Sequence, residues 1–132
     1  MREFQVEVGG ITISSKLTEV EVSSLPEVTQ RDMKNGYVWY ALPPIKVNGE
    51  VVIFDICFYE EKIESVSIYI SNPQKYGGWS DFSEARQKSR AIDTEAWLSR
   101  LGHHVGNYPW GQIWSGYDSK GGSGHGVVRY AL

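Results

Sequence analysis

Hydrophobic and polar residues alternate in the first part of the chain. Phe4, Val6 and Val8 are each separated by a polar residue, and after a Gly-Gly pair the alternation resumes over residues 11–13. A period of two is that of a β-strand with one buried face, and two glycines suit the turn between two such strands. We therefore expect an N-terminal β-hairpin.

The strongest strand pattern lies between residues 36 and 71. The dipeptide Asn48-Gly49 favours a two-residue hairpin turn, since both residues tolerate a positive φ. The alternation around it predicts antiparallel strands that share an apolar face, formed by Val52, Phe54, Ile56 and Phe58 on one strand and by Val66, Ile68 and Ile70 on the next. The opposite face is mixed, with Ile53, Asp55, Cys57 and Tyr59 against Ser65, Ser67 and Tyr69. That second face could be wet or half covered.

The segment "KLTEVEVSSLPEV" fits two structures. Val20 and Val22 could alternate on a strand. Alternatively, Thr18 and Glu21 have the spacing of a capping box and could open a short helix. We favour the helix, which should end before Pro26 because a residue that precedes proline avoids the helical region.

The apolar period changes to three and four residues after Ser80. Asp81 and Glu84 have the spacing of a capping box, and Gly102 supplies a C-terminal stop. The apolar face would run through Phe82, Ala85, Ser89, Ile92 and Ala96, widened by Trp97, Leu98 and Leu101. This pattern predicts a helix over residues 81–101 that lies across the sheet and closes the core.

The chain ends in a second strand pair, "WGQIWSGYD" returning as "GVVRYAL". Four glycines, a serine and His125 fill residues 121–126 between these strands. A phosphate-binding loop would lead from a strand into a helix N-terminus, and no helix follows here. The glycines therefore predict a flexible hairpin tip.

These elements predict an α+β fold: an antiparallel sheet of about six or seven strands packed against one main α-helix, with a short helix near the N-terminus. The 132 residues fit a single domain, residues 1–132. No run approaches the ~20 apolar residues that span a bilayer, and the start of the chain is unlike a secretory signal. A lone cysteine, Cys57, fits a reducing compartment and a buried structural thiol. We expect a cytoplasmic protein that does not bind membranes.

The charge pattern gives no sign of a nucleic-acid partner. The net charge is −3, and the basic residues are scattered. The densest group, Arg86, Lys88 and Arg90, is typical of a solvated helix face. Binding to phosphates needs a concentrated basic patch, so we expect no nucleic-acid partner.

Three histidines offer candidate chemistry, but none lies in a recognisable motif. His103, His104 and His125 match no metal-binding spacing, so we expect no metal and no cofactor. His104, His125, Asp118 and Lys120 have the side chains needed for acid–base hydrolysis or RNA cleavage. Whether they lie together cannot be read from the spacing.

Aromatic residues make up 13% of the chain, and several adjoin glycine or proline. We expect Trp114 and Phe82 to lie in the core. Rings held at turns are harder to bury, and exposed tyrosine and tryptophan often anchor a partner. The predicted binding residues are therefore Tyr76, Trp79, Tyr108 and Trp110, together with Asp55 on the mixed face.

The segments "KYGGWSDFSEARQKSRAIDTEAWL" and "YPWGQIWSGYDSKGGSGHGVVRYA" resemble small cytoplasmic proteins of bacteria, some of which are of the immunity-protein type. Such proteins bind and neutralise toxin domains. The resemblance covers less than half of the chain and carries over no catalytic residue. It implies a bacterial protein that acts by protein–protein interaction.

The sequence thus predicts a non-enzymatic bacterial binding protein of immunity type, with a toxin domain as its protein partner. The acidic balance suits a basic nuclease toxin, since complementary potentials speed association. Two alternatives stay open: a small hydrolase or nuclease that uses His103, His104 or His125, and a carbohydrate- or small-ligand-binding module. The sequence does not indicate the oligomeric state.

Overall fold

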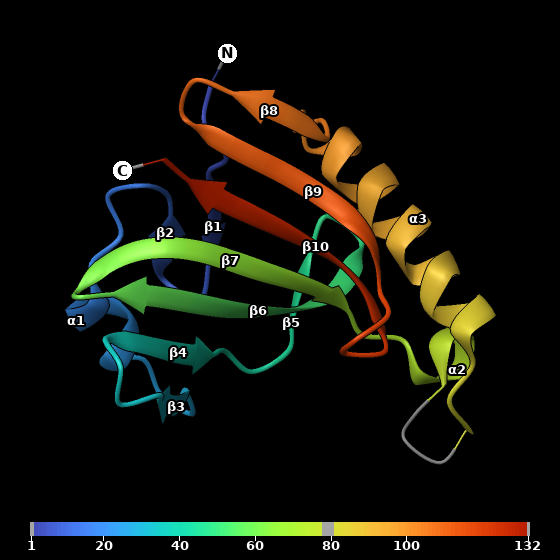
Figure 1. The fold of residues 1–132 in the computed structure, drawn as a ribbon, viewed down its shortest axis with the longest axis horizontal. Coiled ribbons are helices and arrows are strands. Elements are labelled where there is room, and N and C mark those ends of the chain that lie inside the picture. The colour runs from blue at the N-terminus through green and yellow to red at the C-terminus, as the bar shows by residue number, and fades with distance from the viewer. Residues whose placement is uncertain (1, 78–80, 132) are drawn as a thin grey trace.

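The computed structural model describes residues 2–77 and 81–131 and has an α+β fold (Figure 1). In these residues an eight-stranded antiparallel sheet has the order β3-β4-β6-β7-β10-β9-β8, with β5 beside β6, and a two-stranded sheet pairs β1 with β2. The strands of the large sheet are β3 (Thr29–Asp32), β4 (Tyr37–Ala41), β5 (Ile45–Val47), β6 (Glu50–Tyr59), β7 (Lys62–Ile70), β8 (Gly106–Tyr108), β9 (Gly111–Asp118) and β10 (Ser123–Tyr130). The predicted fold class is confirmed, with more strands than expected.

The central strands β6 and β7 form as their alternation predicts. Asn48 and Gly49 have φ values of 49° and 86°, as a hairpin turn between β5 and β6 requires. Phe54 pairs with Ile68 across β6 and β7, and both side chains are fully buried. Because side chains alternate along a strand, this register places the mixed residues of both strands together on the opposite face.

The N-terminal predictions are also confirmed. Strands β1 (Val6–Val8) and β2 (Ile11–Ile13) form the hairpin, and α1 (Glu19–Ser23) follows. Thr18 Oγ1 accepts a hydrogen bond from the Glu21 amide, while Glu21 Oε2 accepts one from the Thr18 amide. This capping box satisfies two amides that would otherwise lack partners at the helix start.

The main helix, α3 (Glu84–Arg100), differs from its prediction in its cap and in its buried face. Ser83 is the N-cap and accepts a hydrogen bond from the Arg86 amide, so the predicted Asp81–Glu84 capping box is wrong. Phe82 and Ile92 are 57% and 70% exposed, although both were expected to be apolar contacts. The face turned to the sheet consists of Gln87, Ala91 and Thr94 together with Trp97 and Leu98, of which Trp97 and Leu98 were predicted to be buried.

Two polar residues on the buried face of α3 explain this error. The Gln87 side-chain oxygen accepts a hydrogen bond from the Gly124 amide, and the Thr94 hydroxyl donates one to the Arg90 carbonyl. Buried polar groups are stable where they are hydrogen-bonded. Arg90 was also misplaced, since its guanidinium is half-buried and donates to the Gly124 carbonyl instead of lying on a solvated face.

The glycines of the last hairpin have two separate roles. The loop between β9 and β10 spans only residues 119–122, and Gly124 and Gly126 lie within β10. A Cβ on Gly124 would stand 1.6 Å from the Gln87 carbonyl oxygen, and one on Gly126 would stand 3.0 Å from Thr94 Cγ2. These two glycines therefore let α3 pack directly on the strand, and only the loop itself is the predicted hairpin tip.

Three short elements were not expected. Strand β3 is exposed along its whole length and carries the polar sequence "TQRD", while β8 has the sequence "GNY". Helix α2 (Pro73–Tyr76) has Asn72 as its N-cap. None of these segments shows an apolar period, because edge strands and single turns bury little surface.

The hydrophobic core lies between the large sheet on one side and α3 with the N-terminal hairpin on the other. Trp97 of α3 contacts Phe54 of β6 and donates its indole hydrogen bond to the Val47 carbonyl. Tyr130 of β10 donates to the Phe4 carbonyl near the hairpin. Among the described residues, no helix is both long enough and apolar enough to cross a bilayer.

Candidate functional site

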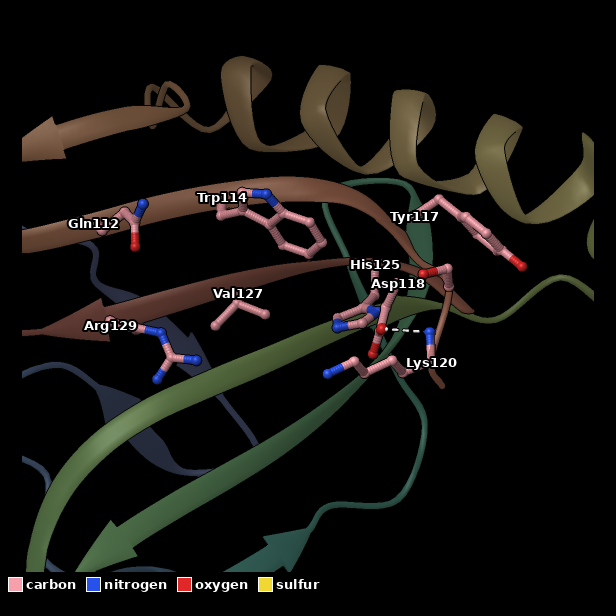
Figure 2. Close-up of a pocket in the computed structure, with 9 residues that line it drawn as sticks. Gln112, Trp114, Tyr117, Asp118, Lys120, His125, Val127 and Arg129 are labelled. Carbon is pink, nitrogen blue, oxygen red and sulfur yellow. Dashed lines mark hydrogen bonds between the residues drawn. The ribbon is translucent and has the colours of Figure 1, made fainter. Parts of the chain in front are cut away.

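The face of the large sheet turned away from α3, which we call the open face, is hollowed. Two adjoining hollows of about 450 and 510 Å³ share Asp118, His125, Val127 and Arg129 in their linings. We call the two together the open-face hollow. Its other side chains come from several strands and include Trp39 of β4, Ser65, Ser67 and Tyr69 of β7, and Gln112 and Trp114 of β9. Figure 2 shows the part of this lining that lies along β9 and β10.

A glycine creates the space for the largest ring of the hollow. Gly116 pairs with His125, and Trp114 pairs with Val127, so these four residues are neighbours on β9 and β10. A Cβ on Gly116 would stand 2.6 Å from Cζ2 of the Trp114 indole. The indole therefore lies along the strand over Gly116, with its ring beside His125 (Figure 2).

His125 lies at the centre of the open-face hollow, between aromatic rings. Its imidazole stacks on Tyr69 at a centroid distance of 4.7 Å and meets the edge of Trp114 at 5.7 Å. Ser123 Oγ lies 3.0 Å from His125 Nδ1. Burial lowers the pKa of His125 below its usual 6.5, outweighing the opposite effects of Ser123 and Asp118. The ring is therefore neutral at pH 7.

Two ion pairs lie beside the hollow. Arg31 Nη2 lies 2.6 Å from a carboxylate oxygen of Asp55, and its guanidinium also lies over the Trp39 ring. Arg129 Nη1 lies 3.0 Å from Glu64 Oε1. These pairs are partly exposed and contribute little to stability. Their main effect is to balance the charge of the open face.

Cys57 lies on the same strand face as Asp55 but is buried. Its Sγ lies 3.5 Å from Glu64 Oε2. Burial, with a smaller effect of the Glu64 charge, raises the pKa of the thiol to about 12. A thiol that stays protonated is a poor nucleophile, in keeping with the structural role expected for it.

The structure brings together part of the acid–base set considered above. His125, Asp118 and Lys120 line the same hollow, and Asp118 Oδ1 accepts a hydrogen bond from the Lys120 amide (Figure 2). His104 lies elsewhere, beside Tyr108, whose hydroxyl donates to the His104 carbonyl. His103 is buried against Phe4, with ring centroids 4.9 Å apart. Among the described residues, no carboxylate is hydrogen-bonded to a histidine.

Tyr76 does not have the exposed position expected for a binding residue. It is 2% exposed, and its hydroxyl donates to Asp93. The ring also lies below the Arg90 guanidinium. Its place in a helical turn that packs on α3 explains this burial, since the neighbouring Gly77 turns the chain without exposing the ring. Trp79, the second ring of this segment, lies outside the described residues.

The remaining predicted rings, Tyr108 and Trp110, form a half-buried pair at the turn between β8 and β9. Their planes are nearly parallel, with centroids 5.2 Å apart, and Trp110 packs against Tyr130. The Trp110 indole Nε1 is buried without a hydrogen-bond partner among the described residues. A binding role for this pair stays a prediction.

Sequence reasoning missed Trp39, Gln112, Trp114 and Val127 as site residues. Trp114 was assigned to the core, whereas it is half-exposed on the open face. The alternation of side chains on β9 and β10 is the sequence signal that could have identified these residues. Residues 112, 114, 125, 127 and 129 fall on one face once the strand pairing is known.

The described residues contain no group of three or more histidine, cysteine, aspartate or glutamate side chains that could hold a metal ion. No family model, no curated protein and no solved structure matches the chain. The candidate site is therefore defined by its geometry alone.

Proposed function

We propose that this chain is a non-enzymatic binding protein that holds a small ligand, or a ligand-sized group of a larger partner, in the open-face hollow. The observation that carries the proposal is the hollow itself, which is lined by rings and polar groups from β4, β7, β10 and β9. Ligand sites commonly have volumes of roughly 300–1,000 Å³ and combine apolar walls with a few polar groups. The two hollows have volumes in this range.

Binding without catalysis fits the chemistry of the lining better than hydrolysis does. A general base is usually oriented by a third group, such as a carboxylate on the far ring nitrogen of a histidine. Here Nδ1 of His125 lies beside the Ser123 hydroxyl, and the ring is clamped against Tyr69. The Cys57 thiol is protonated. These features suit a fixed, neutral hydrogen-bonding group.

A protein partner is the second candidate, and a separate observation favours it. Met33, Tyr37 and Tyr59 are 53%, 36% and 41% exposed, and the two tyrosine rings lie 4.5 Å apart. Tyr37 also lines the hollow, so the apolar surface continues outward from it. A toxin domain with a basic surface, inhibited in the bacterial cytoplasm, would suit this surface and the net charge of −3.

The first test is a ligand-observed NMR screen of sugars, nucleosides, amino acids and short peptides. Each hit is measured again with Val127→Trp, which fills the floor of the hollow, and with Val20→Trp on the exposed side of α1. We expect hits whose binding is lost in the first variant and kept in the second. An absence of hits, or hits that bind both variants equally, would refute the proposal.

The second candidate has its own test. If a toxin domain is captured as partner, Tyr37→Ala and Tyr59→Ala should weaken the complex while leaving unfolding by urea nearly unchanged. Unaltered affinity in both variants would exclude this surface. The Val127→Trp variant separates the two candidates, because it blocks the hollow without altering the exposed tyrosines.

A further inference from the structure

The lining of the open-face hollow carries no net charge. Its carboxylates are Glu64 and Asp118, and its cations are Lys120 and Arg129, which gives two charges of each sign. Arg129 is already bonded to Glu64. A ligand of either sign would meet two like charges as well as two opposite ones, and it would have to displace the Glu64–Arg129 pair to bind either member of that pair. The balance therefore favours a neutral ligand.

Several neutral polar groups of the hollow are free to bind such a ligand. The Ser65 hydroxyl and Nε2 of His125 form no hydrogen bond to any described residue, and the Gln112 amide forms none either. Ser65 and His125 are 3% and 7% exposed. Among the described residues, only Trp110 has a buried side-chain polar atom without a hydrogen-bond partner, so the polar atoms of Ser65 and His125 are reached by solvent. An occupant of the hollow would take over the hydrogen bonds that water makes to them.

The rings supply flat apolar walls between these polar groups. The Trp114 indole lies along β9, and the stacked pair of Tyr69 and His125 lies next to it. Trp39 lines the far part of the hollow. Aromatic faces carry partial negative charge and attract the weakly positive C–H groups of a saturated ring. The occupant should therefore have a C–H face and a polar edge.

We propose that the open-face hollow binds a neutral pyranose sugar, an inference that rests on the hollow being a binding site at all. A pyranose ring has C–H groups on its faces and hydroxyls around its edge, each of which can both donate and accept hydrogen bonds. The C–H face packs on Trp114. A hydroxyl at its edge pairs with Nε2 of His125, whose ring lies beside the Trp114 indole and must be neutral to offer that nitrogen.

The test is a fluorescence and NMR titration with methyl glycosides of glucose, galactose, mannose and N-acetylglucosamine. Glucose 6-phosphate and adenosine serve as a charged sugar and a neutral flat ring. We expect at least one methyl glycoside to bind, and Trp114→Ala to weaken it about tenfold or more, as loss of an aromatic anchor does. Trp114→Phe, which keeps a ring, should lose less.

Phe82→Ala is the matched control, because it removes an exposed ring outside the hollow. Glycoside binding that Phe82→Ala leaves unchanged and Trp114→Ala weakens supports the sugar site. If no methyl glycoside binds, or if Trp114→Ala and Trp114→Phe bind as the wild type does, the sugar site is wrong. Adenosine or a peptide bound in the hollow in place of the glycosides would overturn the sugar proposal and leave the proposed function standing.

Discussion

Two glycines on the last hairpin show how single residues separate folding from function. Gly124 faces α3, and a methyl group there would stand 1.6 Å from a backbone carbonyl oxygen. Gly116 faces the open-face hollow, and the nearest atoms to a methyl group there would all belong to the Trp114 indole, the closest at 2.6 Å. The Gln87 backbone cannot move away from Gly124 without disturbing α3, whereas the half-buried Trp114 ring can rotate away from Gly116.

We therefore predict opposite results for the same substitution at these two sites. Gly124→Ala should lower the free energy of unfolding by about 3 kcal/mol or more, since overpacking against a backbone forces α3 away from β10. Gly116→Ala should keep most of the stability but weaken ligand binding, because the indole loses its place. Urea unfolding and a binding titration of both variants make the comparison. Equal stability of the two would contradict the packing described here.

At the scale of elements, α3 packs on the sheet through Trp97 and Leu98, as predicted, but not through Ile92. Trp97 is fully buried against Phe54, whereas Ile92 is 70% exposed. We predict that Trp97→Ala lowers the free energy of unfolding by about 3–5 kcal/mol, as loss of a large buried ring does. Ile92→Ala should change it by less than about 0.5 kcal/mol. Chemical denaturation checks both values. A large decrease in the free energy of unfolding of Ile92→Ala would show that Ile92 packs on the sheet, as the sequence pattern predicted.

The strand elements were easier to predict than the helix face, for a physical reason. The alternation on β6 and β7 allows only one choice of buried face, because a shift of the strand register by one residue would turn all the apolar side chains to solvent. The face of α3 depends on Gln87 and Thr94, whose partners lie on β10 and on the preceding turn of α3. Such partners cannot be read from a period in the sequence.

The candidate site was predictable only in part, for a related reason. Asp55 and the serines opposite it were correctly assigned to a mixed face. The hollow also needs β10 beside β7, a pairing between segments about 60 residues apart. Tyr76 was misassigned because a ring next to glycine is exposed only if nothing packs on its turn, and here α3 does. Long-range pairing and packing therefore decide the site, and neither has a local signal.

At the scale of the whole molecule, two buried histidines connect stability to pH. Burial lowers the pKa of both His103 and His125 below the 6.5 of an unfolded chain. At a pH between the lowered pKa of the folded protein and the pKa of the unfolded chain, the unfolded chain binds more protons than the folded one. The contribution of these histidines to stability is therefore fully present above pH 6.5 and is lost as the pH falls below it. Asp93, whose pKa is lowered by Lys75 and Tyr76, loses its contribution only below 3.8.

We therefore predict that the urea midpoint falls as pH is reduced from about 7.5 to about 5.5, the region in which an ordinary histidine titrates. The Cε1 proton resonances of His103 and His125 should titrate with midpoints below 6.5. A midpoint of unfolding that stays constant or rises over this range would show that the two rings are not buried as described. Ligand binding should weaken only below pH 6.5, as the pH falls through the lowered pKa of His125 and protonation removes the acceptor on its ring.

The role of the open-face hollow can be measured through the indole N–H resonances of the tryptophans. A ¹⁵N-labelled sample is titrated with the strongest ligand of the NMR screen. Trp114 and Trp39 line the hollow, Trp97 is sealed in the core, and Trp110 lies at the turn between β8 and β9. We predict that the resonances of Trp114 and Trp39 shift together in a saturable way while that of Trp97 stays in place. Saturable shifts at Trp110, with Trp114 and Trp39 unchanged, would place binding at the Tyr108–Trp110 pair and contradict the assignment of function to the open face.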